Sequence, residues 1–143
     1  MIIDYTDQVC IPLFLFARYK DVLKKWERKF SYIMVDEFQD VNEANYQLCE
    51  ALSGNGNLFI VGDPNQMIYS CRGAKSCFFT GFDKIHPGTI DIFLPKNRRS
   101  VKGIVDAANT IIALNKNPLW KPMWPVRLDE NKVQLVHCKT DAD

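Results

Sequence analysis

The chain has 143 residues, about the size of one domain, and its 47% hydrophobic and 24% charged residues are typical of a folded soluble protein. Its formal net charge of +1 provides no global basic field, so any contact with nucleic acid has to be confined to a local groove. The most apolar run, residues 9–17, is far shorter than the ~20 residues of a membrane span, and acidic residues precede it, which argues against a signal peptide. We therefore expect no membrane partner.

The first part of the chain is predicted to contain two helices and a strand. Residues 9–17 predict a buried helix, with Pro12 in its first turn, where a missing N–H has no consequence. Apolar residues recur at helical spacing through residues 21–29 and predict a second helix. The short apolar run at residues 32–35 has the length of a buried strand, and it ends at two adjacent carboxylates.

A helix and a second strand are predicted next. Asp40 and Glu43 resemble a capping box, which indicates a helix start, and Gly54 is expected to stop that helix. The apolar residues 58–61 predict another buried strand, and the Gly-Asp-Pro-Asn sequence at residues 62–65 has the composition of a turn.

The last part of the chain continues the alternation of strands and helices. Residues 90–94 and 133–137 predict strands, and Ser100 is expected to cap a helix that runs through the apolar residues 104–112. Continuously apolar strands that alternate with helices are typical of an α/β fold, in which helices cover both faces of a parallel sheet.

Three carboxylates follow the two strands predicted first. Asp36 and Glu37 come directly after residues 32–35, and Asp63 follows residues 58–61. Ligands of parallel sheets bind beyond the carboxyl ends of the strands, so these side chains converge if the two strands are neighbours. One carboxylate there could hold Mg²⁺ largely through water, and the adjacent one could accept a proton from an attacking water. Solvated turn residues, with Asp40 as a simple helix cap, remain the alternative.

The cysteines show no metal-binding pattern. Their number is odd, and no C-x-x-C sequence occurs among Cys10, Cys49, Cys71, Cys77 and Cys138. This spacing does not favour a zinc site and indicates reduced thiols in a cytoplasmic protein.

Three motifs in a fixed order carry a family resemblance. They are "VDEFQD" at residues 35–40, "IVGDPNQMIYSCRGA" at 60–74 and "LPKNRRS" at 94–100, and an acidic stretch, "IDYTDQV" at 3–9, precedes them. Together they resemble motifs II, III and IV of the UvrD/PcrA/Rep-type superfamily-one DNA helicases, and the resemblance covers nearly the whole chain.

The resemblance implies roles for residues near a nucleotide. Asp36, in the Walker B position, would hold Mg²⁺ on the ATP phosphates, and Glu37 would be the general base for the hydrolytic water. Gln66 would sense the γ-phosphate and link its loss to the DNA groove. Gln39 and Asp40 would support the coupling network beside the phosphates.

Further roles concern DNA and the second motor domain. The resemblance implies that Tyr69 stacks on a base of single-stranded DNA and that Arg72 orders the same loop, although a surface ion pair is nearly as plausible for Arg72. Arg99 would stabilise charge on the transferring phosphoryl group. Arg98 replaces the family's adenine-packing tyrosine, and a guanidinium plane can also stack on a base. Cys71 replaces an aromatic residue of the family pattern.

The resemblance also implies a fold and its boundaries. It indicates part of a RecA-like P-loop NTPase, with residues 1–88 as the carboxyl half of the first motor domain and residues 89–143 as the start of the second. No G-x-x-x-x-G-K-[ST] phosphate loop occurs in the sequence, so we expect the isolated chain to be inactive. The family's central strand is also absent, which predicts an open sheet edge and self-association.

The function implied is that of an ATP-dependent DNA helicase or translocase. The parent protein would use ATP and Mg²⁺ to move on single-stranded DNA and unwind duplex DNA in replication or repair, together with the remainder of the helicase chain. One alternative is a helicase-like scaffold module that does not hydrolyse ATP. A Mg²⁺-dependent phosphohydrolase that uses Asp36, Glu37 and Asp63 is less favoured, because the sequence offers no nucleophile or further ligands for it.

Overall fold

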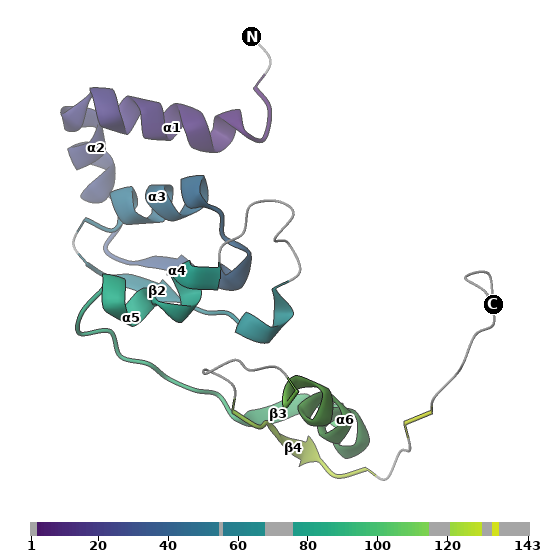
Figure 1. Cartoon of the computed structure of the whole chain (residues 1–143). Coiled ribbons are helices and arrows are strands. Elements are labelled where there is room, and N and C mark those ends of the chain that lie inside the picture. Colours follow the sequence, from purple (N-terminus) through teal and green to yellow (C-terminus); the bar gives the residue numbers. More distant parts are fainter. Residues whose placement is uncertain (1–2, 55, 68–75, 115–120, 130–132, 135–143) are drawn as a thin grey trace. The chain divides into compact units, whose positions relative to one another are not determined.

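The computed structural model describes residues 3–54, 56–67, 76–114, 121–129 and 133–134, and the chain divides into two compact units, Met1–Thr89 and Ile90–Asp143 (Figure 1). Parallel strand pairs and flanking helices make both units α/β, as the sequence predicts. None of the helices in the described part is long and apolar enough to cross a membrane.

The first unit is built on a pair of short parallel strands. Its elements are α1 (Asp7–Arg18), α2 (Lys20–Glu27), β1 (Ile33–Val35), the 3-10 helix η1 (Phe38–Asp40), α3 (Glu43–Leu52), β2 (Leu58–Ile60), the 3-10 helix η2 (Pro64–Gln66), α4 (Ser76–Thr80) and α5 (Phe82–Ile85). β1 and β2 are neighbours and run in parallel, with Met34 opposite Phe59. The strands predicted at residues 32–35 and 58–61 are therefore present and adjacent.

Helix α1 differs from its prediction in two ways. It begins at Asp7, where the backbone N–H groups of Asp4 and Asp7 each donate to the other residue's carboxylate. Pro12 consequently lies inside the helix rather than in its first turn. The helix is also not buried: Phe16 is its buried residue, while Phe14 is exposed, because α1 packs mainly against α2 and α3.

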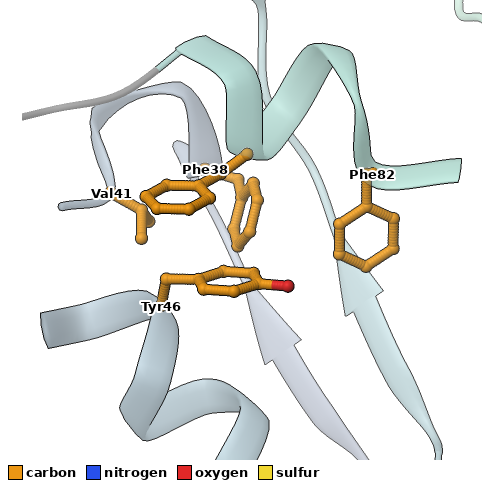
Figure 2. Packing of buried hydrophobic residues seen from close by; sticks show 5 residues of the cluster. Phe38, Val41, Tyr46 and Phe82 are labelled. Carbon is orange, nitrogen blue, oxygen red and sulfur yellow. The ribbon is translucent and has the colours of Figure 1, made fainter. Parts of the chain in front are cut away.

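An aromatic cluster covers one face of the β1–β2 sheet. Its buried members are Phe38, Val41, Tyr46, Phe78 and Phe82, contributed by η1, α3, α4, α5 and the residue after η1. The Tyr46 and Phe78 rings stack at 4.4 Å, and Phe82 meets Phe38 edge-on at 5.7 Å. Figure 2 shows these side chains gathered between the helices and the two strands. Burial, followed by the charge of Glu50, raises the pKa of Tyr46.

The opposite face of the same sheet is open. Met34, Phe59 and Val61 are exposed, while their chain neighbours Val35 and Ile60 pack against the aromatic cluster. The prediction of a sheet covered on both faces is therefore wrong for the described residues. Alternate residues of a strand point to opposite sides, and the buried side chains of η1, α3, α4 and α5 gather on one side of this sheet.

The second unit contains a strand, a helix and a returning parallel strand. These are β3 (Lys96–Val101), α6 (Lys102–Ile112) and β4 (Trp124–Arg127). Val105 of α6 is 1% exposed and forms the centre of this unit. Asn109 ties the helix to the residue that precedes β4, because its side-chain amide donates to the carbonyl of Met123 and accepts from the Met123 N–H.

Several expectations for this second unit are wrong. Residues 90–94 form no strand, because β4 pairs with residues 96–101 and gives the apolar run before them no partner. Ser100 lies in β3, and α6 has Val101 at its N-cap, with no side-chain cap bond. Residues 133–134 are not in a strand, and the rest of the predicted strand at 133–137 lies outside the described residues.

Candidate nucleotide site

The carboxyl ends of β1 and β2 bring two acidic segments to one edge of the sheet. Asp36 and Glu37 follow β1 directly, and Gly62 and Asp63 follow β2 after Val61. The ladder continues past the strands, since the Val61 N–H donates to the carbonyl of Val35. The two segments are therefore held side by side.

A left-handed residue turns the chain away from β1. Glu37 has φ 50° and ψ 41°, a conformation that costs a non-glycine residue roughly 1–2 kcal/mol. Three hydrogen bonds hold this turn: the Glu37 N–H donates to the Asp36 carboxylate at 2.9 Å, Phe38 donates to the carbonyl of Val61, and Asp40 donates to that of Glu37. The turn exposes both the Asp36 and the Glu37 carboxylates at the strand end.

A buried glutamine joins the two segments. Gln39 is 2% exposed, its side-chain amide N–H donates to Glu37 Oε2 at 2.7 Å, and its Oε1 accepts from the backbone N–H of Asp63 at 3.0 Å. Sequence reasoning placed Gln39 only in a supporting network. In the sequence, Gly62 could have indicated this contact. A glycine at the end of a strand often marks a position where another part of the chain comes close to the backbone.

The second segment is ordered around Asp63. One of its carboxylate oxygens accepts from the backbone N–H of Asn65 at 2.9 Å, and the other accepts from the side-chain amide of Gln66, also at 2.9 Å. The Gln66 side chain is exposed. A chain of hydrogen bonds thus runs from Glu37 through Gln39 and Asp63 to Gln66.

Asp40 does not have its predicted local role. Helix α3 is capped by Asn42, whose side-chain oxygen accepts from the Asn45 N–H at 2.9 Å. Asp40 lies earlier, in η1, because the left-handed Glu37 starts a 3-10 turn before the helix. The Oδ1 atom of Asp40 is buried and has no hydrogen-bond partner in the described structure.

The site suits a Mg²⁺ ion that is held mainly by a nucleotide. Within the described residues, no group of three or more His, Cys, Asp or Glu side chains could hold a metal ion. The exposed carboxylate of Asp36 can nevertheless serve as a single protein ligand, since Mg²⁺ keeps several waters and takes one or two carboxylates beside substrate phosphates.

The remaining candidate residues lie in the second unit or outside the described residues. Arg98 and Arg99 are exposed residues of β3, next to Asn97, whose side-chain oxygen accepts from the backbone N–H groups of Arg99 and Ser100. They belong to the second unit. Tyr69 and Arg72 lie outside the described residues, as does Cys71.

Comparison with known proteins identifies the family. The family model described as UvrD/REP helicase N-terminal domain matches residues 1–87. The chain belongs to this family. It is 37% identical over 142 residues to the ATP-dependent DNA helicase PcrA of Staphylococcus aureus, and equally similar to that of Staphylococcus epidermidis. Each alignment covers 99% of this chain and 20% of the relative, so the chain spans about a fifth of the length of these curated relatives.

Membership of the UvrD/REP family confirms the resemblance that the three motifs indicate. Motif II occupies the turn after β1, and the first residues of motif III occupy β2 and η2. The hydrogen-bonded chain from Glu37 to Gln66 therefore connects two motifs that are far apart in the sequence.

Proposed function

We propose that the protein to which this chain belongs is an ATP-dependent DNA helicase or translocase. The observation that carries the proposal is the pair of exposed carboxylates, Asp36 and Glu37, held at a parallel-strand end and hydrogen-bonded through Gln39 to the segment at Asp63. Similarity to proteins described as ATP-dependent DNA helicases supports the same activity.

The residues of the first unit have distinct proposed roles. Asp36 is the ligand of Mg²⁺, which in turn neutralises phosphate charge when ATP is bound. Glu37 is the general base, because its carboxylate is exposed and Gln39 holds only one of its oxygens. Gln66 is the γ-phosphate sensor, and its exposed amide, anchored on Asp63, suits contact with an anion.

The proposed architecture is that of two RecA-like motor domains, of which this chain contains parts. Residues 1–88 belong to the first domain and residues 89–143 to the second. Arg99 stabilises the transferring phosphoryl group, and Arg98 stacks on the adenine. Tyr69 and Arg72 contact single-stranded DNA. The protein acts in the cytoplasm, together with the remainder of the helicase chain.

The isolated chain is proposed to be inactive. Its sequence contains no phosphate loop, so Asp36 and Arg99 would have to bind ATP without the backbone N–H groups of such a loop. We expect a dissociation constant for ATP·Mg²⁺ above ~1 mM, or about −4 kcal/mol. Titration calorimetry on the isolated chain measures it, and a micromolar constant would overturn this part of the proposal.

Hydrolysis that depends on DNA tests the main proposal. We expect the full-length protein to hydrolyse ATP slowly alone and much faster with single-stranded DNA, and to displace a strand from a partial duplex. A full-length protein that binds DNA or protein partners but hydrolyses no ATP would instead identify the non-hydrolysing scaffold module.

A further inference from the structure

Gln39 occupies a position where both ends of its amide are used. It is 2% exposed, yet it lies between the exposed residue Glu37 and the half-buried residue Asp63. The backbone N–H of Asp63 can only donate, so the amide oxygen of Gln39 must face it. The NH₂ group is thereby directed at Glu37 Oε2, at 2.7 Å. The hydrogen-bond partners themselves determine the orientation of this amide.

The Gln39 amide lies directly against Gly62. A Cβ atom placed on Gly62 would lie 2.5 Å from Gln39 Oε1 and 3.0 Å from the ring of Phe79. Any side chain at position 62 would therefore displace the glutamine amide. The absence of a side chain at Gly62 allows Gln39 to approach the backbone after β2.

We propose that Gln39 is a positioning residue that holds the Glu37 carboxylate in the orientation of a general base and links it to the segment at Asp63. The inference rests on the function proposed above. Hydrogen bonding of Oε2 to Gln39 leaves Oε1 of Glu37 to receive a proton from water. Because Asp63 also accepts from Gln66, a displacement of Gln66 by the γ-phosphate is transmitted to the base through this single buried amide.

A buried glutamine that only satisfies its own polar groups would produce a different result on mutation. Loss of such a residue lowers the stability of the fold, whereas loss of a positioning residue lowers the maximal rate of hydrolysis while ATP binding persists. The rate, the ATP affinity and the melting temperature therefore have to be measured together. Ser53, another buried polar residue in the same unit, provides a matched control because its hydroxyl donates to the carbonyl of Glu50, which belongs to neither acidic segment.

The experiment uses the full-length protein in DNA-stimulated ATPase assays. Gln39→Met keeps the length of the side chain and removes both hydrogen bonds, so we expect kcat to fall about 10–100-fold, the loss typical of partners that orient a functional group, with little change in KM. Gly62→Ala should cause a similar fall by displacing the amide. Ser53→Ala should leave kcat unchanged even where it lowers the melting temperature.

The double variant separates the two explanations further. If Gly62 acts only through Gln39, then Gly62→Ala should cost little additional rate in the Gln39→Met background. An unchanged kcat for Gln39→Met, or additive losses in the double variant, would overturn the inference while the proposed function stands. A wild-type protein without DNA-stimulated hydrolysis would overturn the proposed function itself, and the inference with it.

Discussion

Met34 of β1 lies directly opposite Phe59 of β2, and the two side chains are 76% and 56% exposed. Together with Val61 they form an apolar strip along the open face of the sheet. The edges of a two-stranded sheet also carry backbone groups that can pair with another chain. Both features favour association of the isolated chain with itself.

We expect the sedimentation coefficient of the isolated chain to rise with protein concentration as dimers form. Met34→Lys and Phe59→Lys should reduce this rise, because a charge on the strip would have to be desolvated on association. Leu114→Lys is the matched control, since Leu114 is 81% exposed but lies in the second unit. A sharp monomer at every concentration would contradict the expectation.

The stability of the first unit should depend on Phe38. Its ring is 1% exposed and meets those of Tyr46, Phe79 and Phe82. Phe38→Ala removes a buried aromatic ring, which typically costs about 3–5 kcal/mol of unfolding free energy. Met34→Ala, on the exposed face of the same sheet, should change it by less than about 0.5 kcal/mol. Urea denaturation followed by circular dichroism compares the two, and equal losses would show that the aromatic cluster is not the core.

Local patterns predicted the part of the site that is formed by neighbours in sequence. The apolar runs at 32–35 and 58–61 indicated strands, and carboxylates after them indicated one shared edge of the sheet. The double contact of Gln39 could not be predicted, because its bond to Asp63 spans 24 positions and depends on strand register. The misplaced helix cap has a local cause: Asp40 and Asn42 are both good caps, and the left-handed backbone of Glu37 decides between them.

The strand predicted at 90–94 shows a different limit. Its apolar residues suit a strand, but a strand also needs a neighbour that supplies hydrogen bonds, and β4 pairs with 96–101 instead. The pattern describes what a segment can form, whereas the pairing depends on the rest of the chain. The same reason explains the open sheet face, which an apolar pattern alone predicts to be covered.

The neighbouring arginines of β3 should have unequal effects on hydrolysis. Both are exposed, and the irregular register between Asn97 and Val101 falls across them. In the full-length protein, Arg99→Ala should nearly abolish DNA-stimulated hydrolysis at saturating ATP, since an arginine on the transferring phosphoryl group contributes ~10³–10⁵ in rate. Arg98→Ala should mainly raise the ATP concentration required, by the ~0.5–2 kcal/mol of a guanidinium–ring contact. Equal, small losses in steady-state assays would mean that neither arginine lies at the nucleotide.

The most direct measurement compares Glu37→Gln with Asp36→Asn in the full-length protein, with ATP turnover and nucleotide binding measured on the same preparations. Glu37→Gln keeps the shape of the side chain and removes the base, so turnover should fall by ~10²–10⁴-fold while ATP·Mg²⁺ still binds. Asp36→Asn should weaken Mg²⁺-dependent binding as well, because it removes the metal ligand. Near-normal turnover in both variants would contradict the account and would leave Asp36 and Glu37 as solvated residues of a turn.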